Sequence, residues 1–223
     1  MSAARLDLAD PNSVNAFIRA NTRPTAPPLV PEIVLQLADE SVPIWQKTED
    51  ELGQINVPPP YWAFAWAGGQ ALARYILDHP EICRGKRVLD LGSGSGLTAI
   101  AAKKAGARDV IAADIDHLAL ASVLLNATAN GVAVEITAED LLANPPIAFD
   151  VVLVGDLFYE RQLADRVLTY IEAASRLGAA ILIGDPQRNY FPVGRFSAVA
   201  EYQVAVSREL EDSVLKKTVV WRL

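Results

Sequence analysis

Apolar and polar positions recur along the chain with two different periods, and these periods predict the order of its helices and strands. Helical spacing of apolar residues runs from Gln70 to Asp78, where Pro80 ends the pattern. From residue 86 onward, short apolar runs typical of buried parallel strands alternate with helical segments. The predicted strands are 86–91, 110–113, 132–137, 150–154 and 179–184, and the predicted helices are 97–105, 118–129 and 161–175. This alternation predicts an α/β fold with a Rossmann-like, doubly wound, mostly parallel sheet.

The C-terminal segment breaks the alternation. Tyr202–Leu210 and Val214–Leu223 are predicted as two strands joined by an acidic turn around Glu211 and Asp212, with no helix between them. We therefore expect a C-terminal antiparallel β-hairpin that places an antiparallel strand at the edge of the sheet and completes a seven-stranded sheet.

Residues 1–60 differ from the rest of the chain in being rich in proline. Asp10 followed by Pro11 predicts the start of a short helix. The prolines between residues 23 and 31 favour extended backbone, because each fixes its own φ and restricts the residue before it. We expect residues 1–60 to form an N-terminal helical and proline-rich arm or lid, packed on a main domain at 61–223.

Composition and charge narrow the class of protein. With 223 residues, 51% hydrophobic and 21% charged, the chain suits one globular domain with an arm. A net charge of −7 disfavours contacts with the phosphate backbone of nucleic acids and favours basic partners. The single cysteine, Cys83, cannot form an internal disulfide, and no apolar run approaches the roughly 20 residues of a membrane span. We expect a cytoplasmic protein that binds neither nucleic acid nor membrane.

A glycine-rich loop at 92–96 is the most informative segment. A strand runs into it and a helix follows, so the loop lies at the carboxyl end of the sheet, where ligands bind in such folds. The dinucleotide fingerprint requires glycine or alanine where Leu97 stands, and no P-loop Lys follows the glycines. Asp90 would repel phosphate but suits a cofactor with an ammonium and a sulfonium, which favours S-adenosylmethionine. The residues expected to hold it here are Asp90, Gly92, Ser93, Gly94 and Gly96.

Acidic residues after the next two strands complete the predicted cofactor site. Asp114 can accept hydrogen bonds from both ribose hydroxyls, whereas Asp116 is the better N-cap for the following helix. Glu139 or Asp140 can accept a hydrogen bond from the adenine amino group, and we favour Asp140. Apolar contacts to the cofactor are expected from Ile115 and Leu141. His79 and His117 lack neighbours suited to a metal, so we expect none.

Four segments together carry a resemblance to a known family. They are the glycine loop, the stretch from Tyr61 to Leu72, Asp156-Leu157-Phe158-Tyr159, and Gly184-Asp185-Pro186. The chain resembles the class I, seven-β-strand protein-lysine methyltransferases, most of all the electron transfer flavoprotein β-subunit lysine methyltransferases, from about Pro31 onward. The resemblance implies a monomeric S-adenosylmethionine-dependent protein-lysine N-methyltransferase that releases S-adenosylhomocysteine. It also implies the electron transfer flavoprotein β subunit, with an exposed lysine, as the protein partner.

The chemistry of a methyl-accepting lysine suggests roles for Asp156 and Tyr159. A lysine ammonium must lose a proton before it can accept a methyl group, which costs about 4 to 5 kcal/mol at pH 7 unless the site helps. An aromatic pocket beside a sulfonium lowers the lysine pKa through desolvation and repulsion. Asp156 is expected to orient the amine and Tyr159 to shape the pocket, the alternatives being a helix N-cap and a core aromatic.

Trp62 and Trp66 stand four apart, a spacing at which both can simply pack. We expect Trp66 beside the sulfonium or adenosine and Trp62 nearer the acceptor lysine. Phe158 is a further candidate for substrate contact. Arg188 either touches an acidic patch of the partner or lies solvated at the surface.

Two other functions stay open at this point. A small-molecule N-methyltransferase acting on an amine or a pyridine nitrogen, as nicotinamide methyltransferases do, would use the same cofactor site. Its proline-rich arm should then close over the substrate as a lid, whereas a protein substrate needs an open rim. A non-catalytic module with a degenerate cofactor site is disfavoured by the intact glycine loop and Asp114.

Overall fold

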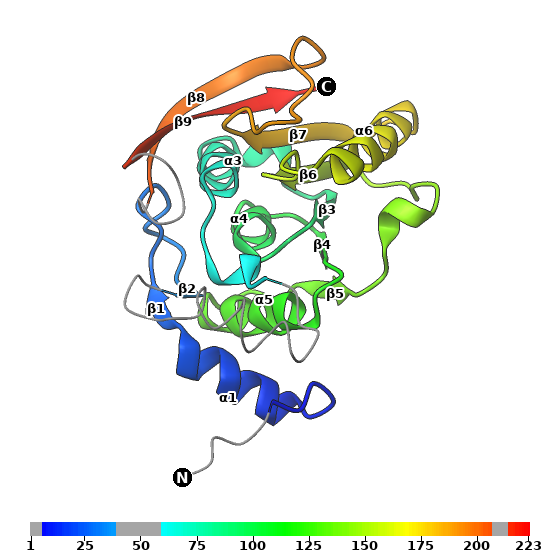
Figure 1. The fold of residues 1–223 in the computed structure, drawn as a ribbon. Coiled ribbons are helices and arrows are strands. Elements are labelled where there is room, and N and C mark those ends of the chain that lie inside the picture. Colours follow the sequence, from blue (N-terminus) through cyan, green and yellow to red (C-terminus); the bar gives the residue numbers. More distant parts are fainter. Residues whose placement is uncertain (1–5, 39–58, 207–213) are drawn as a thin grey trace.

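The chain forms one large mixed sheet with helices on both faces (Figure 1). The computed structural model describes residues 6–38, 59–206 and 214–223. The sheet has seven strands in the order β5-β4-β3-β6-β7-β9-β8. Strands β3 to β7 pair in parallel, whereas β9 pairs antiparallel with both β7 and β8. The strands are β3 Arg87–Leu91, β4 Asp109–Ala113, β5 Glu135–Thr137, β6 Val151–Gly155, β7 Ala180–Asp185, β8 Ser197–Ala205 and β9 Leu215–Arg222.

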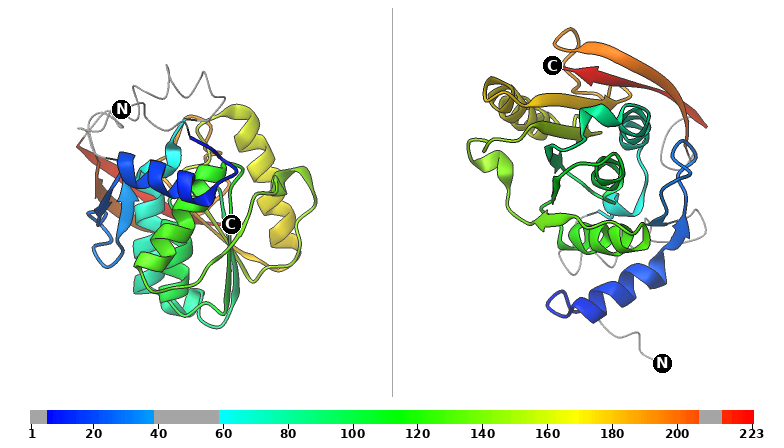
Figure 2. Two further views of the ribbon diagram at one scale, coloured as in Figure 1. Left: turned by 90° about the horizontal axis from the view of Figure 1, so that it is seen from below. Right: turned by 180° about the vertical axis from the view of Figure 1, so that it is seen from behind.

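Successive side chains along the strands face opposite helical layers. The helices that cover the sheet are α3 Ala67–Asp78, α4 Leu97–Lys104, α5 His117–Ala129 and α6 Arg161–Arg176, with short 3-10 turns η2 Tyr61–Ala63, η3 Pro80–Ile82 and η4 Leu141–Ala143. Val88 and Leu153 pack with α3, α4 and α5 on one face, whereas Leu89 and Val154 pack with α6 on the other. Figure 2 shows the two layers from further sides. The predicted doubly wound sheet with a C-terminal antiparallel hairpin is therefore confirmed.

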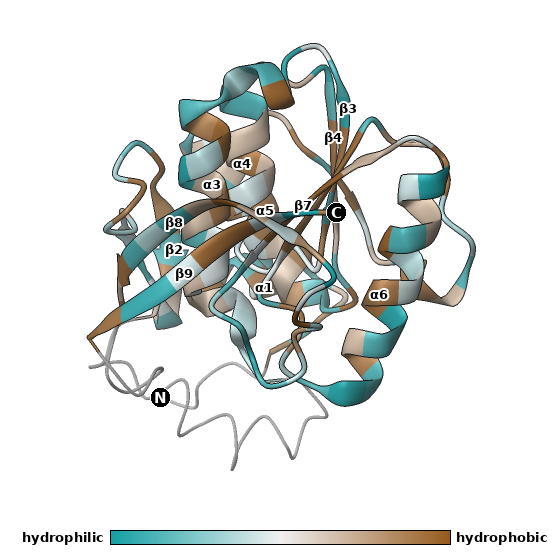
Figure 3. Cartoon of the chain, turned by 90° about the horizontal axis from the view of Figure 1, so that it is seen from above, coloured by the Kyte–Doolittle hydropathy of each residue, from teal (hydrophilic) through white to brown (hydrophobic). Residues whose placement is uncertain are grey.

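Helix α6 shows why the periodicity could be read from the sequence. Its buried residues include Ala164, Val167, Ile171 and Ala174, which recur every three or four positions and form one apolar stripe. Figure 3 shows apolar and polar residues along the same helix. The stripe packs on the sheet, and the charged residues face outward.

The structure differs from the predicted bounds mainly at the sheet edges. Strand β8 begins at Ser197, and a register shift between Ala198 and Ala200 marks a bulge that the sequence pattern did not reveal. Strand β5, predicted over 132–137, is only three residues long. The predicted turn around Glu211 and Asp212 lies outside the described residues.

The described part of the N-terminal segment packs along α5 (Figure 1). Helix α1, Pro11–Asn21, begins as predicted at Asp10, whose side chain accepts a hydrogen bond from the Asn12 amide. Its Val14 and Ile18 pack against Leu118 of α5. The proline-rich stretch begins with strand β1, Arg23–Thr25, which pairs antiparallel with β2, Leu35–Leu37.

Asn126 ties this segment to the glycine loop. Its Oδ1 accepts a hydrogen bond from the Gln36 amide at 2.7 Å, and its Nδ2 donates to the Ser95 carbonyl at 2.8 Å. The side chain is completely buried, so both bonds form away from water, where an unpaired amide group is costly. The loop and β2 are therefore held at a fixed separation through α5.

The first turn of α3 lies unusually close to the end of β7. A Cβ atom built on Gly68 would lie 2.1 Å from the Gly184 carbonyl oxygen and 2.5 Å from Oδ2 of Asp156. One built on the neighbouring Gly69 would meet only a methyl carbon of Leu97, at 4.0 Å. Glycine at position 68 is therefore required by backbone contact, while position 69 has room for a side chain.

Alanine substitutions at Gly68 and Gly69 should have different effects on the stability of the fold. We expect Gly68→Ala to destabilise the fold by about 1 to 3 kcal/mol, because the helix must move away from the sheet. Gly69→Ala should be neutral or stabilising by up to about 1 kcal/mol, since alanine favours helix. Urea unfolding followed by circular dichroism measures both free energies of unfolding. Equal stability of the two variants would contradict the close contact.

Candidate active site

A cavity of about 410 Å³ opens at the carboxyl ends of the parallel strands. Its size suits a small-molecule ligand, and it lies where β3 borders both β4 and β6, the switch point at which doubly wound sheets bind ligands. Most of the predicted site residues line it. They are Trp62, Trp66, Gly92, Gly94, Asp114, Ile115, Asp140, Leu141, Asp156, Tyr159 and Arg188.

The glycine loop bends through left-handed backbone conformations that favour glycine. Gly92 has φ +66°, Gly94 has φ +52° and Gly96 has φ +82°. A Cβ on Gly92 would also lie 2.7 Å from a methyl carbon of Leu157. Gly92 and Gly94 border the cavity, whereas Gly96 packs against Val123 and starts α4. The loop therefore presents backbone, not side chains, to a ligand.

Asp90 does not face the cavity, which corrects the expectation that its charge meets the cofactor. The carboxylate is buried and accepts hydrogen bonds from the Ser93 hydroxyl at 2.7 Å, the Thr98 hydroxyl at 2.5 Å and the Ala99 amide at 3.0 Å. Burial raises the pKa of Asp90 above its usual range, while these donors lower it. Asp90 and Ser93 therefore fasten the loop to the start of α4 from behind.

Asp114 and Asp116 have different roles, and the helix cap falls on Asp116, as predicted. Asp116 is the N-cap of α5 and accepts from the Leu118 amide at 2.8 Å. Asp114 lies at the end of β4, where Oδ2 accepts from the Gly94 amide at 2.9 Å and Oδ1 from the Asp116 amide at 3.0 Å. Burial raises the pKa of Asp114, and it raises that of Asp116 to about 6. Asp114 thus joins the glycine loop to the wall of the cavity.

Residues after β5 form the wall at the far end. Asp140 accepts from the Leu142 amide at 3.2 Å and pairs with Nη2 of Arg166 at 2.6 Å. Glu139 and Arg166 border the same region, and no sequence pattern singled out Arg166, which lies on α6. Ile115 and Leu141 add apolar surface there.

Asp156 lies at the opposite end of the cavity, just after β6, and it does not cap the helix that follows it. The N-cap of α6 is Glu160, so that structural alternative for Asp156 is wrong. Its Oδ2 instead accepts a hydrogen bond from the Gly69 amide at 2.9 Å. Because the Trp66 side chain does not cap α3, Asp156 supplies this acceptor from another part of the fold. Asp156 has φ +58°, a conformation that non-glycine residues rarely adopt.

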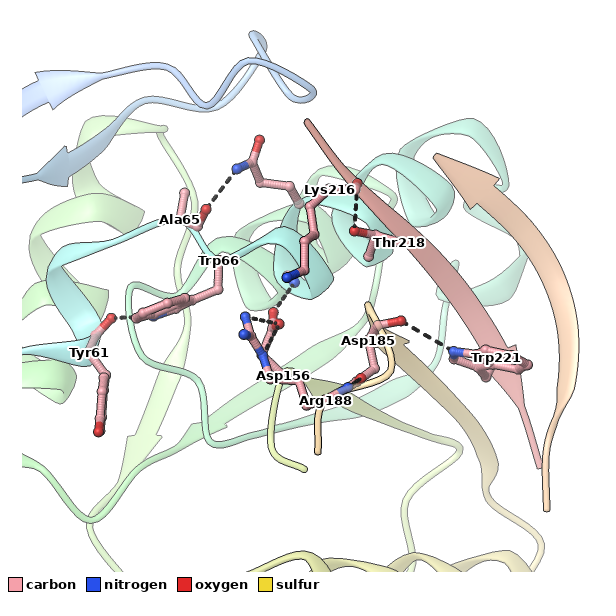
Figure 4. A network of polar contacts seen from close by, with 11 residues as sticks. Tyr61, Ala65, Trp66, Asp156, Asp185, Arg188, Lys216, Thr218 and Trp221 are labelled. Carbon is pink, nitrogen blue, oxygen red and sulfur yellow. Dashed lines mark hydrogen bonds and ion pairs between the residues drawn. The ribbon is translucent and has the colours of Figure 1, made fainter. Parts of the chain in front are cut away.

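Arg188 is paired with Asp156 and is not the solvated surface arginine that was one expectation. Its Nε and Nη2 donate to Oδ1 of Asp156 at 2.9 and 2.7 Å, and its backbone amide donates to Oδ1 of Asp185 at 2.7 Å. The guanidinium carbon lies 5.3 Å from the centre of the Trp66 ring, within range of a cation–π contact. Asp156 and Trp66 therefore hold this side chain beside the cavity, while Asp185 holds its backbone (Figure 4).

Asp185, at the end of β7, adds a second carboxylate behind this pair. It is completely buried, and its Oδ2 has no hydrogen-bond partner among the residues that the structure describes. Burial and, next, the neighbouring charge of Asp156 raise the pKa of Asp185 to about 7. Sequence reasoning noted the Gly-Asp-Pro segment but assigned Asp185 no role.

Aromatic residues wall the cavity between its two ends. The roles expected of the two tryptophans, Trp66 beside the cofactor and Trp62 nearer the acceptor lysine, stay predictions. Trp62 is buried beside Gly94 of the loop, whereas Trp66 lies beside Arg188. The Trp62 indole N–H has no partner within the described ranges. Tyr61, which sequence reasoning did not single out, has its ring centre 5.6 Å from that of Tyr159.

Tyr159 and Phe158 differ although they are adjacent. Tyr159 lines the cavity and is 41% exposed, so it is not a core residue. Burial of its hydroxyl raises the pKa to about 12, which keeps the phenol protonated at neutral pH. Phe158 is completely buried and packs edge-on against Phe191. The prediction that Phe158 contacts substrate is therefore wrong, because its side chain belongs to the core.

Comparison with known proteins agrees with this architecture. A family model described as ribosomal protein L11 methyltransferase (PrmA) matches residues 70–171. The solved ribosomal protein L11 methylase from Lactobacillus delbrueckii subsp. bulgaricus has a TM-score of 0.51 and 21% identity, covering 71% of this chain and 80% of its own. Magnesium protoporphyrin IX methyltransferase from Synechocystis, solved with bound S-adenosylmethionine, has a TM-score of 0.52 and 14% identity over 82% and 97%. These two likenesses concern the fold.

Curated relatives are much more similar in sequence. The electron transfer flavoprotein beta subunit lysine methyltransferase of Homo sapiens is 38% identical over 215 residues, covering 93% of this chain and 81% of the relative. Its counterpart from Xenopus laevis is 39% identical over 212 residues, covering 92% and 85%. The chain therefore belongs to the electron transfer flavoprotein beta subunit lysine methyltransferase family.

Proposed function

We propose that this chain is an S-adenosylmethionine-dependent protein-lysine N-methyltransferase that acts on the electron transfer flavoprotein β subunit. The observation that carries the proposal is one cavity with two chemically different ends. The glycine loop and Asp114 form the end that suits a nucleoside. Asp156, held among aromatic side chains, forms the end that suits an amine.

The cofactor end fits S-adenosylmethionine in its polar groups. The Asp114 carboxylate is positioned by the loop and can accept hydrogen bonds from the ribose hydroxyls. The buried indole N–H of Trp62 has no partner among the described residues, and a cofactor carboxylate would satisfy it. Glu139 or Asp140 would meet the adenine amino group, with Ile115 and Leu141 as apolar walls. The product S-adenosylhomocysteine would occupy the same groups.

The acceptor end fits a lysine amine. S-adenosylmethionine supplies a methyl group already activated by the sulfonium, so the protein mainly has to align the amine with it. Asp156 would accept a hydrogen bond from the amine and orient it, while Tyr159 and Trp66 exclude water. Partial desolvation of the amine among these rings lowers its pKa toward the working pH.

The rim favours a protein substrate over a small molecule. Pro59, at the end of the arm, lines the cavity, but no residue of the described stretch 6–38 does, so the proline-rich stretch at 23–31 does not close over it. Ile115, Tyr61 and Tyr159 are instead exposed at or beside the opening. An exposed apolar rim suits docking of a folded partner better than enclosure of a small substrate.

We extend the proposal to the remaining features of the chain. Residues 1–60 act as an arm that braces the methyltransferase domain at 61–223, as the contacts of α1 and Asn126 suggest. The net charge of −7 suits a partner with basic surface and disfavours nucleic acid. The enzyme works as a monomer in the cytoplasm, where a lone buried Cys83 is compatible with reducing conditions. No helix in the described ranges is long and apolar enough to cross a membrane.

Loss of the Asp114 carboxylate should weaken cofactor binding. We expect Asp114→Ala to raise the Kd for S-adenosylmethionine about 10- to 100-fold, the equivalent of one or two charge-assisted hydrogen bonds. Asp116→Ser removes a second carboxylate from the cavity wall but keeps a good helix cap, so its Kd should stay near wild type. Isothermal titration calorimetry measures both values. The reverse ranking would assign the ribose contact to Asp116.

Asp156 should matter for transfer and not for cofactor binding. We expect Asp156→Ala to slow methyl transfer by about 100-fold or more, because the amine loses its orienting acceptor, while the Kd for S-adenosylmethionine stays unchanged. Glu160→Ala, four residues along, removes an exposed carboxylate that makes no capping hydrogen bond and should leave the rate unaltered. Single-turnover transfer of a labelled methyl group measures the rates. Unchanged transfer by Asp156→Ala would remove this residue from the mechanism.

The acceptor itself can be tested directly. Purified enzyme should transfer label from S-adenosylmethionine to the β subunit of electron transfer flavoprotein, and mass spectrometry of the labelled band should find methyl-lysine. The Asp156→Ala variant is the negative control and should transfer little label. Label that appears only in the small-molecule fraction of a cell extract would support the alternative of a small-molecule N-methyltransferase.

A further inference from the structure

Asp156 is neutralised on one side before any substrate reaches it. Two hydrogen bonds from the Arg188 guanidinium go to its Oδ1, at 2.9 and 2.7 Å, and the two side chains are largely buried. Both residues line the cavity, so an amine that contacts Asp156 also comes close to the positive charge of Arg188.

This pairing bears on the protonation of an acceptor lysine. A bare carboxylate stabilises an ammonium and raises its pKa, which works against methyl transfer because only the neutral amine is a nucleophile. A guanidinium at similar distance has the opposite effect, since two positive charges repel. Asp156 alone would therefore hold the lysine well, but in its unreactive form.

We propose that Arg188 is a positioning residue that offsets the charge of Asp156, so that the acceptor lysine is held as the neutral amine. The inference rests on the lysine methyl transfer proposed above. The proton leaves the ammonium for solvent before the amine nitrogen bonds to the methyl carbon and the carbon–sulfur bond breaks. Arg188 itself exchanges no proton, because a guanidinium stays charged in proteins.

The fold holds Arg188 in place for this role. Its backbone amide donates a hydrogen bond to the buried Asp185 at 2.7 Å, and the preceding Gln187 has φ +63°, a conformation that costs a non-glycine residue free energy. Its guanidinium lies over the Trp66 ring. An arginine that merely balanced charge at the surface would need neither the Gln187 conformation nor the buried partner.

Other ionisable groups border the same cluster and set its net charge. Asp185 adds a negative charge from β7 once the pH exceeds its pKa of about 7. Tyr159 adds none, because burial raises its pKa to about 12. The further groups are Tyr61 of η2, Asp114 at the cofactor end and Lys216 of β9, which belongs to the same network of polar contacts (Figure 4).

The pH dependence of transfer tests the inference. The substrate is the flavoprotein β subunit at saturating concentration with full-length enzyme, so that the rate reports ionisations within the complex. In Arg188→Gln we expect the pH midpoint of the rate to rise by about one unit or more, with a tenfold fall at pH 7 for each unit. KM for the protein substrate should not rise. Arg188→Lys keeps the charge and should keep a midpoint close to wild type.

Asp185→Asn should shift the pH midpoint of the rate in the opposite direction to Arg188→Gln. It removes a negative charge from the same cluster and should lower the midpoint, whereas damage to the fold would not move the two midpoints in opposite directions. An unchanged midpoint in Arg188→Gln, or a rise in KM alone, would overturn the role proposed for Arg188. If wild-type enzyme methylates no lysine at any pH, the proposed function fails instead. The Kd of each variant for S-adenosylmethionine checks that its cofactor site is intact.

Discussion

The contact between the first turn of α3 and the end of β7 determines the geometry of the acceptor end. Gly68 and Gly184 lie so close that neither position has room for a Cβ atom. This approach brings the amide of Gly69 within hydrogen-bond distance of Asp156, which sits in a backbone conformation that only strong local contacts can maintain. Trp66, at the N-cap of the same helix, is placed beside Arg188 by the same contact. Helix, carboxylate and arginine are thus positioned together.

The two ends of the cavity use carboxylates in different ways. At the proposed cofactor end, Asp90 is buried and holds the loop from behind, while Asp114 reaches the cavity and accepts hydrogen bonds from the backbone amides of Gly94 and Asp116. At the proposed acceptor end, the Arg188 guanidinium donates to Asp156 and offsets its charge, while the Arg188 backbone amide is held by Asp185. A nucleoside needs an oriented acceptor for its hydroxyl groups, whereas a lysine nucleophile needs an acceptor that does not hold its proton.

The elements and the cofactor loop could be predicted because they depend on local patterns. Strand-to-glycine transitions, the spacing of buried residues on α6 and the Asp10 and Asp116 caps all appeared where the sequence indicated them. Packing across the fold could not be predicted in this way. Nothing near Phe158 indicates that it faces the core while Tyr159 faces the cavity, nor that Arg188 reaches back to Asp156 across 32 positions. The same applies to Asp90, whose partners Thr98 and Ala99 lie beyond the loop.

A crystal structure of the enzyme with S-adenosylhomocysteine and a lysine peptide from the flavoprotein β subunit is the most direct measurement. The predicted result has the ribose on Asp114 and the lysine nitrogen within hydrogen-bond distance of Asp156, with Arg188 still on the other side of that carboxylate. A nucleoside bound away from the glycine loop, or a lysine nitrogen that approaches the sulfur without contact to Asp156, would contradict the two-ended site.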